Sequence, residues 1–229
     1  MKELINYFTK FEIALWSCSI LAILLSFCLF DKENYLTLIA SVIGATFLIF
    51  NAKGNPIGQF LTIVFSILYG IISYSFAYYG EMITYLGMTL PMASFALVSW
   101  LKNPYNNNKS EVKVNKLSRF EIAFMLVLTV IVTVIFYFIL KYFNTANIVP
   151  STVSVTTSFL AVYLTFRRSP YFALAYAMND LVLIVLWILA SISDISYLSV
   201  VVCFLVFFVN DTYGFISWKQ MEKRQKVNM

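Results

Sequence analysis

The sequence has no histidine and little charge, and these shortages exclude whole classes of protein. Only 12% of the 229 residues are Asp, Glu, Lys or Arg, whereas 61% are hydrophobic. In soluble domains about a quarter of the residues are charged. The composition therefore excludes an ordinary soluble domain and predicts a protein that lies within a membrane.

Several kinds of catalytic and metal site are missing as well. Without histidine there can be no HExxH zinc site and no Ser-His pair, and the chain has neither GxSxG nor a glycine-rich phosphate loop. Cys18, Cys28 and Cys203 lack metal-binding or redox spacing, and because they fall in apolar segments we expect small core residues. We expect no metal, no cofactor and no enzymatic activity. A dyad of Asp180 and Asp211, as in intramembrane aspartic proteases, is the disfavoured enzymatic alternative.

Long apolar runs fill most of the chain. Polar and turn-rich breaks separate eight segments, roughly 11–30, 35–50, 57–79, 82–101, 120–143, 148–166, 171–192 and 195–218. A helix needs about 20 residues to cross a bilayer, and most segments approach this length. The sequence therefore predicts an all-α integral membrane protein with about eight transmembrane helices.

The basic residues are placed very unevenly along these segments. If the segments cross the membrane in turn, all 16 Lys and Arg except Lys32 and Lys141 fall on the side of the N-terminus. Lys and Arg concentrate in cytoplasmic loops, so both termini are predicted to be cytoplasmic. An anionic inner leaflet accounts for the net charge of +5, and no nucleic-acid partner is needed.

The chain also contains an internal duplication. Lys10-Phe11-Glu12-Ile13-Ala14 returns as Arg119-Phe120-Glu121-Ile122-Ala123, and Ser99-Trp100 returns as Ser217-Trp218. Each half holds an even number of segments, so the halves have the same orientation, as in transporters built from parallel repeats. The polar, Asn-rich stretch 102–118 is the natural linker between them.

Polar groups inside the apolar segments point to a site. The pattern Asn-Asp, six residues, Trp occurs at 179–187 and again at 210–218. An ionised carboxylate at mid-membrane costs about 2.5–3.5 kcal/mol and usually faces a cavity or a partner. Structural hydrogen bonds between helices and an interfacial Trp belt are the alternative reading. The candidate substrate-binding residues are Asn179, Asp180, Trp187, Asn210, Asp211, Tyr213, Gln59 and Tyr69.

Four ordered motifs resemble the PnuC family of bacterial vitamin transporters over roughly residues 40–220. They are Ala52-Lys53-Gly54 with Gly58-Gln59, Tyr79-Gly80-Glu81-Met82, Pro91-Met92 to Trp100-Leu101-Lys102-Asn103, and Asn210-Asp211-Thr212-Tyr213-Gly214-Phe215 to Trp218.

The resemblance implies a SWEET-like fold in a 1+3+1+3 arrangement. The expected parts are an N-terminal helix (1–34), a three-helix bundle (35–103), a cytoplasmic linker loop with a linking helix (104–147), a second three-helix bundle (148–220) and a cytoplasmic tail (221–229). A homotrimer in the bacterial inner membrane is also implied by the resemblance.

The resemblance further implies uptake of a vitamin precursor by facilitated diffusion, with a cytoplasmic kinase that traps the substrate by phosphorylation. Nicotinamide riboside is the expected substrate. Thiamine, riboflavin or a deoxynucleoside are alternatives, and so is proton-coupled transport through Asp180 or Asp211. A flat, cationic ring would gain from an aromatic face and a carboxylate.

Overall fold

The computed structural model describes residues 7–75, 79–145 and 147–227, and confirms the prediction of eight transmembrane helices. Lys2 and parts of four predicted regions, at 1–6, 76–78, 146 and 228–229, lie outside the described residues. The eight spans are α2 (Lys10–Phe30), α3 (Tyr35–Ala52), α4 (Pro56–Ser75), α5 (Tyr79–Ile83) with η1 (Thr84–Thr89) and α6 (Leu90–Leu101), α7 (Arg119–Tyr142), α8 (Ile148–Phe166), α9 (Tyr171–Ser191), and η2 (Ile195–Tyr197) with α10 (Leu198–Val227).

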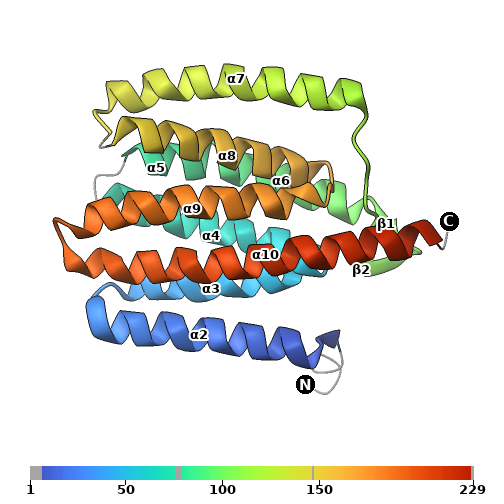
Figure 1. Ribbon diagram of the computed structural model, residues 1–229, viewed down its shortest axis with the longest axis horizontal. Helices are drawn as coiled ribbons and strands as arrows, with labels where there is room; N and C mark the ends of the chain where they lie inside the picture. The colour runs from blue at the N-terminus through green and yellow to red at the C-terminus, as the bar shows by residue number, and fades with distance from the viewer. Residues whose placement is uncertain (1–6, 76–78, 146, 228–229) are drawn as a thin grey trace.

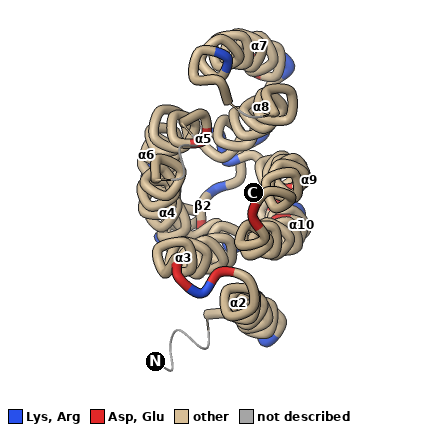
Figure 2. Tube along the Cα trace, turned by 90° about the vertical axis from the view of Figure 1, so that its left-hand side faces the viewer, with Lys and Arg blue, Asp and Glu red and all other residues tan. Residues whose placement is uncertain are grey.

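Six of the eight spans form a closed ring. Going round it, α3 packs on α4, α4 on α6, α6 on α8, α8 on α9, α9 on α10, and α10 returns to α3. Helix α2 lies outside the ring against α3 and α10, and α7 lies outside it against α8 (Figures 1 and 2). The buried core is therefore the interior of the ring, and α2 and α7 present most of their apolar surface to lipid.

The outer position of α2 corrects one expectation. Cys203, on α10, is buried as predicted, but Cys18 and Cys28 on α2 are exposed. An apolar segment does not have to be a core segment in a membrane protein, because lipid is as apolar as a protein interior.

The outer helices begin in the same way. In α2 the Thr9 side chain accepts a hydrogen bond from the Glu12 N–H, and the Glu12 carboxylate accepts one from the Thr9 N–H. Ser118 and Glu121 form the same capping box in α7. Such boxes satisfy backbone donors that have no partner within the helix. The duplicated sequence is thus a duplicated helix start.

The polar stretch after α6 is more ordered than the predicted linker loop. It contains a hairpin of β1 (Pro104–Tyr105) and β2 (Asn108–Val112). Its turn residues, Asn106 and Asn107, both have positive φ, 48° and 59°. Asparagine tolerates this conformation, which two-residue hairpin turns require.

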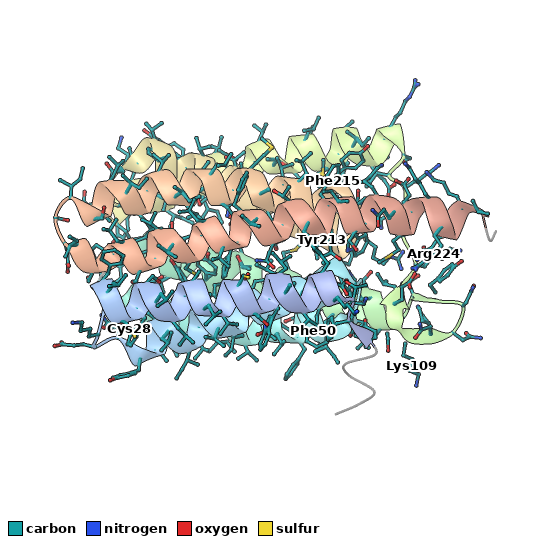
Figure 3. All side chains as sticks on the ribbon, turned by 60° about the horizontal axis from the view of Figure 1, so that its bottom comes forward. Cys28, Phe50, Lys109, Tyr213, Phe215 and Arg224 are labelled. Carbon is teal, nitrogen blue, oxygen red and sulfur yellow. The ribbon has the colours of Figure 1, made fainter. Side chains whose placement is uncertain are left out.

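Helix α10 runs past 220, where the sequence analysis placed the start of a tail. Near its end Gln225 donates to the Val112 carbonyl (3.1 Å) and accepts from the Val114 N–H (2.8 Å). Arg224 pairs with Glu111 at 2.6 Å. The hairpin and the end of α10 therefore form one layer at one end of the bundle, called the hairpin end below (Figures 1 and 3).

At the hairpin end, the last helix of each half donates a hydrogen bond to the end of the second helix of the other half. Trp100 Nε1 on α6 donates to the Thr165 carbonyl of α8 at 2.9 Å, and Trp218 Nε1 on α10 donates to the Asn51 carbonyl of α3 at 2.7 Å. Both indoles are fully buried, and their rings lie 5.4 Å apart.

The serines before these tryptophans repeat the contact. Ser99 donates to the Phe166 carbonyl and Ser217 to the Ala52 carbonyl, at 3.0 and 2.7 Å. The last carbonyls of a helix lack partners within it, and in a membrane such groups must be satisfied by protein. The two Ser-Trp pairs meet this need together with the N–H groups of the following turns, and they join the halves.

We predict that Trp100→Phe and Trp218→Phe each lower the free energy of unfolding by about 1 kcal/mol, because each leaves a helix-end carbonyl without its indole donor. Thermal unfolding in detergent measures the effect. Trp16→Phe is the control, since Trp16 is 38% exposed and its indole donates to a side-chain hydroxyl, that of Thr46, and not to a helix-end carbonyl. Equal stability of all three variants would contradict the structural role of the pairs.

Candidate functional site

The ring of helices encloses a small central chamber. Its volume is about 50 Å³. It is lined by Phe47, Leu48, Asn51, Thr62, Phe65, Tyr85, Thr89, Ser158, Tyr176, Asn179, Asp180, Leu183, Phe204, Phe207 and Asp211. Drug-sized ligands occupy pockets of about 300–1,000 Å³, so the chamber is in a closed conformation.

Asn179 on α9 is oriented by three hydroxyl groups. Its Oδ1 accepts from Thr157 at 2.8 Å, from Ser158 at 3.1 Å and from Ser154 at 3.3 Å, all on α8. Among the described residues its amide NH₂ makes no hydrogen bond. The α8 hydroxyls thus fix the carbonyl side of the amide and leave the donor side for a partner in the chamber.

The next residue supplies the acidic group. Asp180 on α9 and Asp211 on α10 are both buried and both line the chamber, near enough for the charge of one carboxyl group to affect the other. The Asp180 Oδ2 atom is buried with no hydrogen-bond partner among the described residues. A buried carboxylate oxygen without a partner is costly, so this atom is the strongest sign of a ligand position in the ring.

The opposite side of the chamber carries a second amide. Asn51 Oδ1, at the end of α3, accepts from Gln59 Nε2 on α4 at 2.8 Å, and Gln59 is itself fully buried. Gln59 therefore does not line the chamber but orients Asn51, which does. Gly58 makes this possible, because a Cβ there would lie 2.2 Å from Asn51 Oδ1.

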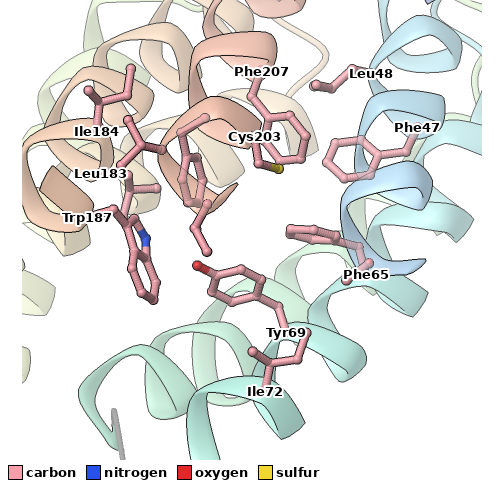
Figure 4. Close-up of a cluster of buried hydrophobic side chains, with 14 residues drawn as sticks. Phe47, Leu48, Phe65, Tyr69, Ile72, Leu183, Ile184, Trp187, Cys203 and Phe207 are labelled. Atoms are coloured by element: carbon pink, nitrogen blue, oxygen red, sulfur yellow. The ribbon is translucent and has the colours of Figure 1, made fainter. Parts of the chain in front are cut away.

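Aromatic rings form the rest of the wall (Figure 4). Phe47, Phe65 and Phe207 pack in one cluster, and the Phe65 ring stacks on Tyr69 at 5.4 Å. Tyr69 is buried behind the lining residue Tyr85, with ring centroids 4.4 Å apart. Tyr69 therefore supports the aromatic wall and is not itself a lining residue.

Tyr85 and Thr89 reach the chamber from the π-helix η1. Pro91 follows within α6, and its ring nitrogen cannot donate a hydrogen bond to the preceding turn. Short π-helical segments accommodate such interruptions and are frequent at functional sites.

Trp187 lies beside a different cavity. This cavity, of about 170 Å³, opens at the end of the bundle opposite the hairpin and is also lined by Glu81, Thr145, Asn147 and Ser151. Trp187 shares the face of α9 with Asp180 but lies two turns, about 10 Å, further along. The Trp187 ring packs 5.5 Å from Tyr197 and belongs to the same buried cluster as Tyr69 (Figure 4).

Asn210 and Tyr213 face away from the chamber, toward α2. Asn210 Nδ2 donates to Ser19 Oγ at 2.9 Å, and the Tyr213 hydroxyl donates to Glu12 at 2.9 Å (Figure 3). Glu12 also pairs with Lys53 at 3.2 Å. Of the eight candidate residues, the structure thus brings Asn179, Asp180 and Asp211 together at the chamber.

Asn51 and the lining aromatic residues were not predicted as site residues. Asn51 stands beside Lys53-Gly54, where a polar residue is ordinary at a helix end. Phe47, Phe65 and Tyr85 cannot be distinguished in a chain that is 18% aromatic. The polar run Thr157-Ser158 on α8 was a usable signal, because adjacent hydroxyls within an apolar helix need partners.

Comparison with known proteins agrees with this architecture. Residues 34–220 match the family described as nicotinamide mononucleotide transporter. Over 228 residues the chain is 26% identical to the nicotinamide riboside transporter PnuC of Neisseria mucosa, covering 97% of this chain and 86% of that protein. A crystal structure titled as the vitamin B3 transporter PnuC has the same fold, with a TM-score of 0.81, 22% identity, and coverage of 95% and 94% of the two chains.

A ring of membrane helices around a polar and aromatic chamber defines a multi-pass membrane transporter. More specifically, the chain belongs to the nicotinamide mononucleotide transporter family, and the resemblance to PnuC is confirmed. The matched relatives are transporters, in agreement with the expectation that the chain is not an enzyme.

We predict that Gly58→Ala destabilises the fold by about 1–3 kcal/mol, because the new methyl group overlaps the Asn51 amide and breaks its bond to Gln59. The measurement is thermal unfolding. Gly214→Ala is the matched control on α10, since its Cβ would meet Ala173 at an ordinary 3.5 Å. If both variants unfold alike, the close approach at Gly58 does not position Asn51.

Proposed function

We propose that this chain carries nicotinamide riboside across the membrane by facilitated diffusion, and that the central chamber binds it. The unpartnered Asp180 oxygen beside aromatic walls is the observation that carries the proposal. Nicotinamide riboside has a cationic aromatic ring, and such a ring is attracted both to a carboxylate and to the faces of aromatic side chains. The name of the Neisseria relative supports the same substrate.

The amides suit the rest of this ligand. The free NH₂ of Asn179 can donate to ribose hydroxyls or to the carboxamide oxygen, and Asn51 on the opposite wall offers a second amide. Because the closed chamber holds about 50 Å³, binding requires the helices to separate. Trp187, Asn210 and Tyr213 stay candidates for substrate contacts in an open conformation.

We further propose how the protein is oriented in the membrane and how its two halves are related. Among the described residues, every Lys and Arg except Lys32 and Lys141 is at the hairpin end. We therefore place this end on the cytoplasmic side of a bacterial inner membrane. The matching Ser-Trp contacts of the two halves support a SWEET-like parallel repeat with α2 and α7 as the added helices. Assembly as a homotrimer and trapping by a cytoplasmic kinase follow from the resemblance alone.

Ligand-induced thermal stabilisation of the purified protein tests the substrate. We expect nicotinamide riboside, at 100 times its dissociation constant, to add about 2.7 kcal/mol of stability, and thiamine, riboflavin and deoxynucleosides to add much less. In Asp180→Asn the dissociation constant should rise about tenfold, equivalent to about 1.4 kcal/mol, because the cation loses its carboxylate.

Thr133→Val is the control, since the Thr133 hydroxyl bonds to Thr156 between α7 and α8, and neither residue lines the chamber. It should bind like the unaltered protein. A different preferred ligand would replace nicotinamide riboside in the proposal, and unchanged affinity in Asp180→Asn would remove Asp180 from the site.

Proton-coupled transport is the second candidate, because Asp180 and Asp211 line the same chamber and two neighbouring buried carboxyl groups cannot both ionise readily. Uptake into proteoliposomes separates the two mechanisms. Facilitated diffusion predicts the same initial uptake rate with and without an imposed pH gradient. A rate that rises severalfold with the gradient, and loses this rise in Asp211→Asn, would establish coupling instead.

A further inference from the structure

The cavity that Glu81 and Trp187 line, at the end of the bundle opposite the hairpin, is separate from the central chamber and is called the outer cavity below. Its volume is about 170 Å³, against about 50 Å³ for the chamber. A protein cavity of about 150 Å³ is large enough to bind benzene. The outer cavity therefore has room for one six-membered ring in the conformation in which the chamber is closed.

Glu81 gives the outer cavity a negative charge. Among the described residues that line the cavity, Glu81 is the only charged one. Its side chain is partly exposed and makes no hydrogen bond or ion pair with another described residue. An ionisable group within a membrane-spanning segment is costly unless it faces water or a partner of opposite charge. The carboxylate is therefore available to a cation that enters the outer cavity.

Gly80 fixes the wall of the outer cavity beside Glu81. A Cβ at Gly80 would lie 2.5 Å from Leu140 Cδ2 and 2.8 Å from Thr145 Oγ1, closer than side chains normally approach. Glycine thus lets the beginning of α5 pack closely against the end of α7 and the connection that follows it. Thr145 also lines the outer cavity, so this close approach places Glu81 in the cavity wall.

Trp187 supplies an aromatic side chain to the same cavity, from α9. A cation is attracted to the face of an indole ring and, more strongly, to a carboxylate. A flat ring that carries a positive charge therefore matches both Glu81 and Trp187, whereas a neutral ring of the same shape gains only from Trp187.

The outer cavity and the central chamber share two helical elements. Glu81 lines the cavity and Tyr85, four residues later, lines the chamber; on α9, Trp187 lines the cavity and Asp180, seven residues earlier, lines the chamber. Residues at these spacings lie on one side of a helix. Tyr85 is near enough to both Glu81 and Asp180 for the charge of each to act on its hydroxyl group. The two sites are therefore consecutive along the bundle.

Tyr69 lies between the two sites. Its ring centroid is 4.4 Å from that of Tyr85, and its hydroxyl group points toward Trp187 (Figure 4). Glu81 is near enough for its charge to act on this hydroxyl group as well. Because Tyr69 is buried, it separates the outer cavity from the chamber in this conformation. We expect Tyr69 and Tyr85 to move when a solute passes from one site to the other.

We propose that the outer cavity is a second binding site, in which Glu81 and Trp187 hold the flat cationic ring of the solute before the ring enters the central chamber. The inference rests on the proposed function for the identity of that solute. In the proposed orientation this end of the bundle faces the outside of the cell, from which a vitamin precursor is taken up. The outer site is accessible while the chamber is closed.

Two small probes test the outer site on the purified full-length protein. 1-Methylnicotinamide has the cationic ring of nicotinamide riboside without the ribose, and nicotinamide is its neutral counterpart. Saturation-transfer NMR titrations give the dissociation constant of each. We expect the cation to bind about tenfold more tightly than the neutral ring, and this preference to disappear in Glu81→Gln, because the counter-charge is lost.

Glu33→Gln is the matched control, since it removes the same charge from an exposed position at the same end of the bundle. It should change the affinity for the cation less than twofold. A second pair of variants adds a charge instead. Ser193→Lys places a cation in the outer cavity from an exposed position and should weaken binding of 1-methylnicotinamide more than tenfold. Ser191→Lys adds the same charge at a residue that does not line the cavity, and should have little effect.

Uptake of nicotinamide riboside into proteoliposomes links the outer site to transport. In Glu81→Gln the initial rate should fall severalfold at concentrations below KM and recover at saturating concentrations, because capture of the cation is impaired and the chamber is unchanged. The outer site is overturned if the cation and the neutral ring bind alike, or if either Glu81→Gln or Ser193→Lys binds the cation as tightly as the unaltered protein.

Asp180→Asn separates this inference from the proposed function. We expect it to bind 1-methylnicotinamide within twofold of the unaltered protein while its affinity for nicotinamide riboside falls. If the cation is lost in Asp180→Asn and kept in Glu81→Gln, the ring binds only in the chamber, and the outer site is wrong while the proposed function stands. If the cation binds as expected but nicotinamide riboside is not transported, the proposed substrate is wrong and the outer site for a cationic ring stands.

Discussion

The structure depends on one constraint: in hydrocarbon, every polar group must find its partner within the protein. Two solutions are visible. At the hairpin end, Trp100 and Trp218 donate to the last carbonyls of α8 and α3, so each half completes the other. In the middle of the ring the polar groups are only partly satisfied: three hydroxyls hold one side of the Asn179 amide, and one oxygen of Asp180 has no partner. The first arrangement joins the halves, and the second leaves binding capacity where a solute can reach it.

The two ends of the ring are held together differently. The hairpin end is held by backbone-directed bonds, the Glu12–Lys53 and Glu121–Arg167 ion pairs, and the layer of hairpin and α10. The opposite end has a cavity beside Trp187, with short connections between the helices. Separation of the halves at the hairpin end must break both Ser-Trp pairs, one across the α6–α8 seam and one across the α10–α3 seam. The two indole rings lie 5.4 Å apart, so these contacts are linked and not independent.

The number of helices and most of their limits could be predicted because the bilayer sets helix length and the sequence marks each break with charge, Gly or Pro. The end of α10 could not, because it is held by the hairpin beyond the apolar segment. The direction of each polar side chain could not. Asn179 and Asp180 are adjacent on α9 and both line the chamber, but of the adjacent Asn210 and Asp211 on α10 only Asp211 does. Asn210 turns to α2, which packs on the other side of α10 and supplies Ser19 as its partner. Trp187 shares a face with Asp180, but distance along the helix places it at another cavity. For Trp187, the spacing in the sequence predicted the shared helix face but not the position along the helix at which the site lies.

The duplication helps to distinguish what the fold needs from what function needs. Positions that carry the same chemistry in both halves, such as the capping Glu12 and Glu121 or the two Ser-Trp pairs, are explained by the fold that both halves share. Positions that differ at equal geometry are not. The chamber uses hydroxyls and Asn179 on one side but Asn51, oriented by Gln59, on the other. An asymmetric ligand requires such differences, because a site with two equal halves would offer the same groups to both of its ends.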